Sequence, residues 1–197
     1  MAKKTADKSP HSSSTMSSSL STSSSSPSTI TVCFVTRNAA ATIKDAIETA
    51  HLLSGDVVVV DTGSTDATKK ILDEFAAHKK IIFRELLQTD ETLDYSAARN
   101  ECLNHARGNW IMIMDQDEIL TPPTVRRLRA VLDYQGADAY VLTKRTYTRG
   151  DGAPLGTVKD TAGTSDTPLL KQKCAAFTHF SDGRMIRLFK NNQKYRF

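Results

Sequence analysis

The chain has 197 residues, 39% of them hydrophobic, and a formal net charge of +4, which is enough for one domain with a real core. No run approaches the ~20 apolar residues of a membrane span, so we expect a domain that is soluble or peripheral to a membrane. Residues 1–29 supply +2 of the charge, and the basic C-terminal stretch alternates like a strand, so we expect no nucleic-acid partner. The three cysteines, Cys33, Cys102 and Cys174, are far apart and indicate a reducing compartment rather than a zinc site or disulfide framework.

Residues 1–29 form a tail rich in serine and threonine with almost no apolar side chains. Such a segment cannot bury enough surface to offset its ordering entropy, so we predict that it is disordered. It has no apolar h-region, which argues against a secretory signal. The folded domain is therefore predicted for residues 30–197.

Strands and helices alternate through the next part of the chain. The predicted elements are a strand at 31–35, a helix at 39–53, a strand at 56–60, a helix through 71–76, a strand at 80–83, a helix at 93–106 and a strand at 110–114. The strand at 56–60 is β-branched throughout and is expected to be central in its sheet. Ser64 is the expected N-cap of the helix that follows it, with Asp66 in the first turn.

Beyond residue 120, the pattern predicts fewer regular elements. Thr121 and Pro122 open a helix that runs to Leu132, and a strand is expected at 139–142. Residues 146–180 have no sustained period and are predicted to form a long loop. The alternation as a whole predicts an α/β fold with a mostly parallel sheet covered on both faces.

The fourth predicted strand ends abruptly in three carboxylates, Asp115, Asp117 and Glu118. In open α/β sheets, ligands bind at the carboxyl ends of the strands. Asp115 and Asp117 are two residues apart and point the same way in an extended chain, so they offer hard oxygen ligands to Mg²⁺ or Mn²⁺. Taken alone, such a cluster more often begins a solvated turn, and we expect Glu118 to be a helix or turn acid rather than a third ligand.

Four segments occur in a characteristic order and spacing, with a weaker fifth. They are Val35-Thr36-Arg37-Asn38, Val59 to Asp66, Asp94 to Asn100, Gly108 to Glu118 and, more weakly, Arg187 to Asn191. Together they resemble the inverting family 2 glycosyltransferases with a GT-A fold, especially the branch of lipopolysaccharide-core glucosyltransferases and peptide S-glycosyltransferases. The resemblance covers residues 30–121 and, less securely, 184–197. It implies a GT-A (Rossmann-like), mostly parallel sheet flanked by helices.

The resemblance also implies a nucleotide-sugar site, whose donor is expected to be a uridine diphosphate sugar. Its residues would be Thr36, Arg37, Asn38, Asp61, Thr62, Arg99 and Asp115. Asp61 would meet the base or ribose, since a carboxylate can accept the imide N–H of uracil. Many relatives carry a second acid where this chain has Thr62, so the contact could shift by one residue.

Several residues of these segments also have a plain structural alternative. Thr36, Arg37 and Asn38 could form a polar turn, and Ser64 and Asp66 are expected to be caps. The guanidinium of Arg99 suits a diphosphate, but the same helix offers it a salt bridge to Asp94 or Glu101.

For the acidic cluster, the resemblance implies a metal site at Asp115 and Asp117. Asp115 would contact ribose or a metal-bound water, and Asp117 would bind Mn²⁺ or Mg²⁺ between the two phosphates of the donor. The cation would neutralise charge on the departing nucleoside diphosphate.

The chain departs from this family where the acceptor should bind. The Gly-x-x-His-Glu-like segment and the acceptor helices of this branch are absent from the sequence, so we expect a truncated form that holds the donor-binding part. An inverting transferase needs a general base, but none is assigned. The candidates Asp160, Asp166, His179 and Asp182 are each expected to be loop residues.

Several matters stay open at the level of sequence. The acceptor could be a glycan, a lipid-linked glycan or a peptide. The alternative function is a catalytically incomplete GT-A module for nucleotide binding or protein interaction. A nucleotidyltransferase is disfavoured because Thr36-Arg37-Asn38-Ala39-Ala40 has no glycine. A cytoplasmic location, possibly peripheral at the membrane, is expected because nucleotide sugars are made there.

Overall fold

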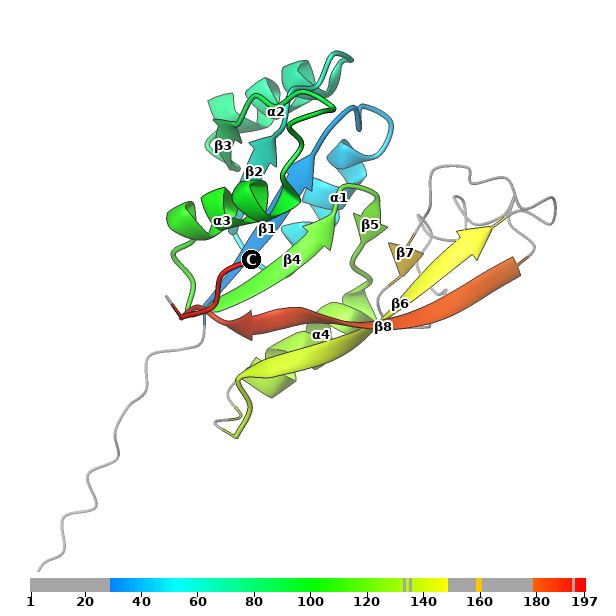
Figure 1. The fold of residues 1–197 in the computed structure, drawn as a ribbon. Helices are drawn as coiled ribbons and strands as arrows, with labels where there is room; N and C mark the ends of the chain where they lie inside the picture. Colours follow the sequence, from blue (N-terminus) through cyan, green and yellow to red (C-terminus); the bar gives the residue numbers. More distant parts are fainter. Residues whose placement is uncertain (1–28, 133, 135, 149–158, 161–178, 193) are drawn as a thin grey trace, which may run out of the picture.

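The computed structural model describes residues 29–132, 134, 136–148, 159–160, 179–192 and 194–197. Within them a twisted sheet carries helices on both faces (Figure 1). The elements are β1 (Ile30–Thr36), α1 (Ile43–Ala50), β2 (Asp56–Asp61), α2 (Thr68–Ala77), β3 (Ile82–Glu85), α3 (Tyr95–His105), β4 (Trp110–Asp115), β5 (Glu118–Ile119), α4 (Pro122–Leu132), β6 (Ala139–Thr148), β7 (Lys159–Asp160) and β8 (His179–Lys190). The tail that we predict to be disordered lies outside the described residues, except for Thr29.

The strands of the sheet are ordered β3-β2-β1-β4-β8-β6-β7-β5. Strands β3, β2, β1 and β4 are parallel to one another, whereas β8 is antiparallel to both β4 and β6. This confirms the predicted α/β fold with a mostly parallel sheet flanked by helices. It also confirms that the β-branched strand β2 is interior, since β1 and β3 pair with its two edges.

Side chains of the parallel strands alternate between two separate cores, because successive residues of a strand point to opposite faces. Val32 and Phe34 of β1 join the core that contains residues of α1, α2 and α4. Cys33, between them, joins the core on the other face, where Ala98, Cys102 and other residues of α3 pack. Burial on both faces explains why these strands read as continuous apolar runs rather than as polar and apolar alternation.

The observed bounds differ from the predicted ones where turns replace regular structure. The predicted helix at 39–53 is regular only over Ile43–Ala50, with turns at both ends. Ser64 is not the N-cap of α2; the cap position is Ala67, and Ser64 bonds instead to Asp61. That prediction was wrong because the side chain satisfies the preceding turn rather than the helix that follows.

The second half of the chain contains more strand than the periodicity predicts. The strand expected at 139–142 extends to Thr148, and β8 begins at His179, so the predicted loop at 146–180 is wrong at both ends. Cross-strand pairing of β6 with β8 fixes these residues in a ribbon, a long-range effect that no local pattern contains. Residues 149–158 and 161–178 lie outside the described residues.

Candidate functional site

A pocket of about 280 Å³ opens where β1, β2 and β4 end. It is lined by Val35, Thr36, Arg37, Thr62, Tyr95, Asp115, Gln116 and Asp117. Five of these, Thr36, Arg37, Thr62, Asp115 and Asp117, are residues that the sequence predicts for the donor or metal site. The pocket lies at the carboxyl edge of a parallel sheet, where such folds bind ligands. The other three predicted residues, Asn38, Asp61 and Arg99, are not among the residues that line it.

Gln116, between the two aspartates, ties the end of β4 to the end of β1. Its Oε1 accepts hydrogen bonds from the Thr36 hydroxyl and from the Arg37 backbone N–H, both at 2.8 Å. Its Nε2 donates to the Arg37 carbonyl at 3.2 Å. Thr62 adds β2 to this arrangement, since its backbone N–H donates to the Thr36 carbonyl at 3.0 Å. Gln116 is not among the site residues predicted from the sequence, although its position between the two aspartates is a signal that could have identified it.

Asp115 is held by an arginine from a distant part of the chain. Arg187 of β8 donates from Nη1 and Nη2 to the two carboxylate oxygens of Asp115, at 3.2 and 2.7 Å. The same Nη2 also donates to Oε1 of Glu118 at 2.7 Å. Lys144 of β6 lies 3.7 Å from Asp115 and 3.9 Å from Glu118. The described cluster therefore joins two carboxylates to two cations.

Glu118 is fully buried and belongs to the short strand β5, so its prediction as a helix or turn acid is wrong. Its Oε2 accepts the backbone N–H of Asp115 at 3.0 Å, and the carboxylate is thereby bonded on both oxygens. A buried charge is tolerated only when it is paired and hydrogen-bonded, and Arg187 provides the pairing. Burial alone would lower the pKa of Arg187, but the hydrogen bond to Asp115 and the charges of Glu118 and Asp115 raise it.

Asp61 faces inward and organises the turn after β2. Its side chain accepts the backbone N–H of Gly63 at 3.2 Å and that of Ser64 at 2.9 Å, together with the Ser64 hydroxyl. The residue is 2% exposed. Asn38, whose φ is 49°, joins the same region, because its Oδ1 accepts the Thr65 N–H at 2.7 Å. Contact of Asp61 or Asn38 with a base or ribose stays a prediction.

Asp66 lies two residues before α2, so the expectation that it belongs to the first turn of that helix is wrong, although its side chain does bond to backbone N–H groups. Its two carboxylate oxygens accept the backbone N–H groups of Thr68, at 2.9 Å, and Ala40, at 3.1 Å. Partial desolvation opposes the shift, but these hydrogen bonds lower the pKa of Asp66 below its ordinary value. The carboxylate therefore joins α2 to the chain that follows β1.

Arg99 lies on α3, one turn after the pocket residue Tyr95. Its guanidinium lies over the rings of Tyr95 and Phe197, at 5.9 and 5.2 Å from their centroids. The two acids that the sequence offers as partners are used elsewhere: Asp94 caps α3, and Glu101 pairs with His105 at 2.9 Å. The structure thus favours neither salt bridge for Arg99, and its contact with a diphosphate stays a prediction.

Arg37 has an unusual set of partners at the pocket wall. Its Nη2 pairs with Asp90 at 2.8 Å, while its Nη1 is buried without a hydrogen-bond partner. An unpaired buried donor costs free energy. Such a donor beside a pocket is suited to an acceptor on a bound ligand, such as a phosphate or carbonyl oxygen.

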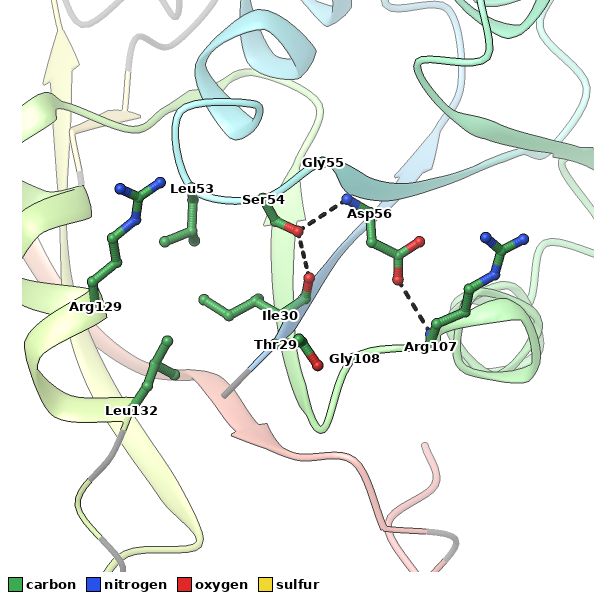
Figure 2. A pocket seen from close by; sticks show the side chains of 10 residues that line it. All are labelled: Thr29, Ile30, Leu53, Ser54, Gly55, Asp56, Arg107, Gly108, Arg129 and Leu132. Atoms are coloured by element: carbon green, nitrogen blue, oxygen red, sulfur yellow. Dashed lines mark hydrogen bonds between the residues drawn. The ribbon is translucent and has the colours of Figure 1, made fainter. Parts of the chain in front are cut away.

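A larger cavity, of about 650 Å³, lies at the opposite edge of the sheet, where β1 and β2 begin (Figure 2). Arg107 and Arg129 stand on opposite sides of it. Its polar groups serve the fold: Ser54 donates to the Ile30 carbonyl at 2.5 Å, and Asp56 accepts the Arg107 N–H at 3.2 Å. None of the predicted site residues lines it, so we place the candidate site at the smaller pocket.

The smaller pocket contains two carboxylates, Asp115 and Asp117. No cluster of three or more histidine, cysteine or acidic side chains that could hold a metal is found among the described residues. Mg²⁺ and similar ions are often bound by one or two carboxylates together with substrate phosphates. Asp115 and Asp117 provide that number of carboxylates, although both oxygens of Asp115 already bond to Arg187.

None of the described helices combines the length and the apolar character that crossing a bilayer requires.

Residues 31–190 match the model of the family described as Glycosyl transferase family 2. The match covers most of the chain, so the chain belongs to this family. The GT-A (Rossmann-like) fold expected from the sequence motifs agrees with this membership.

Individual relatives match a shorter stretch. A TPR repeat-containing protein of Synechococcus elongatus is 32% identical over 58% of this chain and 27% of its own length. Glycosyltransferase GlyA of Streptococcus pneumoniae is 33% identical over 55% of this chain and 15% of its own length. The chain thus spans less than a third of each.

A solved structure of S. aureus TarS 1–349 in complex with UDP is also similar, at 22% identity over 64% of this chain and 38% of that one. The TM-score of 0.48 is too low to support more than this general likeness.

Proposed function

We propose that this chain contains the donor site of a metal-dependent, inverting glycosyltransferase that uses a uridine diphosphate sugar. The observation that carries the proposal is the pocket at the ends of β1, β2 and β4, which contains Asp115 and Asp117 beside Thr36, Arg37 and Thr62. Membership of glycosyl transferase family 2 supports the same function. The acceptor, whether glycan, lipid-linked glycan or peptide, is not assigned, and the cytoplasmic location stays a prediction.

Asp117 would hold Mn²⁺ or Mg²⁺, and Asp115 would accept a hydrogen bond from the donor or meet a metal-bound water. The cation supplies charge neutralisation for the departing nucleoside diphosphate. Arg37 would add the buried Nη1 donor that the protein itself leaves unpartnered. Gln116 keeps the backbone of Arg37 against the end of β4 and so fixes the shape of the pocket.

The proposed reaction is a direct displacement at the anomeric carbon. The acceptor oxygen forms the new bond to that carbon, the bond to the diphosphate oxygen breaks, and a general base takes the proton of the acceptor. Two of the residues considered for this base lie in β8 and a third, Asp160, lies in β7, so the expectation that these three are loop residues is wrong. Asp182 is paired with Arg145 at 2.8 Å, which lowers the pKa of Asp182, and His179 is the first residue of β8. We assign the base to none of them.

The second candidate function, of a different class, is a catalytically incomplete module that binds a nucleotide or a protein. The bonds from Arg187 to both carboxylate oxygens of Asp115 favour it, because they compete with a metal ion for those oxygens. The two functions differ in turnover, whereas both allow nucleotide binding, so donor affinity is the first property to measure.

The test is calorimetric titration of uridine diphosphate into the purified chain with Mn²⁺, with Mg²⁺ and with a chelator. We expect binding that requires the metal and that Asp117→Ala weakens tenfold or more, which corresponds to ~1.4 kcal/mol. The matched control is Asp73→Ala, which removes an exposed aspartate from α2 and should leave the affinity unchanged.

Absence of binding by the folded wild-type chain under all three conditions would exclude uridine diphosphate as the donor nucleotide. Binding that persists with chelator, or that Asp117→Ala does not weaken, would exclude the metal role. If binding behaves as expected, release of uridine diphosphate from a uridine diphosphate sugar distinguishes the transferase from the binding module.

A further inference from the structure

Arg187 lies at the point where the pairing of β4 with β8 stops. The last registered pair is Met112 with Leu188, and Arg187 is the next residue of β8. Beyond this point β4 continues to Asp115, which is one of the two carboxylates that line the pocket. Arg187 is 6% exposed and is not among the pocket-lining residues. It therefore acts on the pocket through the side chains that it contacts.

The contact with Arg187 restricts both the position and the orientation of the Asp115 carboxylate. Two separate guanidinium nitrogens bond to the two carboxylate oxygens, at 3.2 and 2.7 Å. This planar, two-point contact fixes orientation as well as position, which a single ammonium group cannot do. The Asp115 side chain remains 34% exposed, so its outer side can still meet a ligand in the pocket.

Glu118 anchors the arginine from the other side. It is fully buried, accepts from Arg187 Nη2 at 2.7 Å and receives the backbone N–H of Asp115 at 3.0 Å. Arg187 and Glu118 thus hold both the side chain and the backbone of Asp115. The turn that contains Asp115, Gln116 and Asp117 is fixed at both of its ends.

Stability alone gives a weak reason for this buried network. Desolvation offsets much of the attraction in a buried ion pair, and well-packed apolar residues are often as stabilising. The Nε of Arg187 is moreover buried without a partner, which adds a cost. The side chain of Leu188, the neighbouring residue, packs in the apolar core, so an arginine is not needed to attach β8 to the core.

We propose that Arg187 is a positioning residue of the donor site, which acts through Asp115 and makes nucleotide affinity depend on β8. Arg187 holds Asp115 as an oriented hydrogen-bond acceptor and balances its charge. In this arrangement the Mn²⁺ or Mg²⁺ ion would be bound by Asp117. This inference rests on the proposed function, because it assigns a role within the same pocket.

The test compares Arg187→Met, which removes the charge, with Arg187→Lys, which keeps the charge but cannot bond to both oxygens in the same way. The control is Lys190→Gln, which breaks the exposed pair of the same strand with Asp138 (2.7 Å). For each variant we would measure thermal unfolding, the affinity for Mn²⁺ alone by electron paramagnetic resonance, and the affinity for uridine diphosphate in Mn²⁺ by calorimetry.

We expect both Arg187 variants to bind uridine diphosphate at least tenfold more weakly, while Arg187→Met binds Mn²⁺ alone as tightly as the wild type or more tightly, because a nearby positive charge is gone. The control should match the wild type in all binding measurements. A purely structural role would reduce both affinities together, in proportion to the loss of folded protein.

A double-mutant cycle with Asp115→Asn keeps the inference testable if Arg187→Met does not fold. Because Arg187 acts through Asp115, the effect of Arg187→Lys on nucleotide affinity should largely vanish in the Asp115→Asn background. Unchanged nucleotide affinity in folded Arg187→Lys, or fully additive effects in the cycle, would overturn the positioning role. Failure of the wild type itself to bind the nucleotide would overturn the proposed donor, and this inference with it.

Discussion

Gly108 determines how closely the start of β4 can approach the start of β1. Its backbone N–H donates to the Thr31 hydroxyl at 2.7 Å. A Cβ at this position would lie 2.5 Å from the Thr31 nitrogen and 2.6 Å from the Ile30 carbonyl carbon. Both contacts are with backbone atoms of a buried strand, which cannot move aside as a flexible side chain would. The family motif that contains Gly108 therefore needs a glycine here, because there is no space for a side chain.

We predict that Gly108→Ala lowers the free energy of unfolding by ~1–3 kcal/mol, the usual cost of overpacking, as measured by chemical denaturation. Gly55→Ala is the matched control, because a Cβ at Gly55 would meet nothing within 4 Å. The control should lose no stability. Equal stability of the two variants would contradict the close approach of the two strands.

The carboxylates of the site show that residue type does not determine role. Asp115 and Asp117 lie in the pocket, whereas Glu118, one residue further, is completely buried and pairs with Arg187. The carboxylate of Asp61 is of a type that could bind a ligand, but it accepts hydrogen bonds from the turn that follows β2. Burial and local hydrogen bonds, rather than charge, separate these four acids.

At the scale of elements, β8 connects the parallel part of the sheet to the ribbon that it forms with β6. Its side chains divide sharply: Leu188 is fully buried in the larger core, whereas Ile186 is 63% exposed. The ring of Tyr140 in β6 lies against Trp110 of β4, with centroids 5.4 Å apart. Strand β8 is therefore part of the folded core of the domain.

We predict that Leu188→Ala lowers the free energy of unfolding by ~2–5 kcal/mol, because it leaves a cavity in the core. Ile186→Ala, on the exposed face of the same strand, should change it by less than ~0.5 kcal/mol. Urea denaturation of both variants provides the measurement. Similar losses for both would mean that β8 does not pack as described.

At the scale of the whole molecule, ligand binding and folding are linked. The pocket is assembled from the ends of three strands, with Arg187 of a fourth holding Asp115. An unfolded chain cannot hold these groups together, so a ligand that binds here binds the folded state alone. Binding must then raise the stability of the domain.

We predict that uridine diphosphate with Mn²⁺ raises the free energy of unfolding by ~2.7 kcal/mol when free ligand is 100 times its dissociation constant. A thermal unfolding series with increasing ligand measures this effect. Asp117→Ala should show little shift at the same ligand concentration, and chelator should abolish the shift in the wild type. A shift that persists with chelator would place binding elsewhere or make it independent of metal.

Much of this fold is predictable from the sequence because its signals are local. Apolar strands buried on both faces, helices with regular spacing and short connections specify an α/β sheet. The elements from β1 to β4 follow in the expected order, and only the short, unpredicted β5 separates them from the expected helix α4. The carboxyl ends of parallel strands meet at one edge, so Thr36, Thr62 and Asp115 could be expected to lie together. The pocket contains all three.

The remaining features depend on pairing between distant segments. Arg187 meets Asp115 across 72 residues of sequence, and Gln116 bonds to Arg37 across 79. Strand β8 runs antiparallel between β4 and β6, and its place depends on which edge of the sheet is free. No local pattern encodes that choice.

The sequence by itself thus determined the class of fold, the order of elements from β1 to β4 and the carboxylates that end β4, because periodicity and strand ends are local properties of the chain. The tertiary structure alone decided that Glu118 is buried, that Ser64 serves the turn after β2, and that Arg187 orients Asp115. These outcomes depend on which groups meet in three dimensions, where desolvation obliges each buried charge to find its partner.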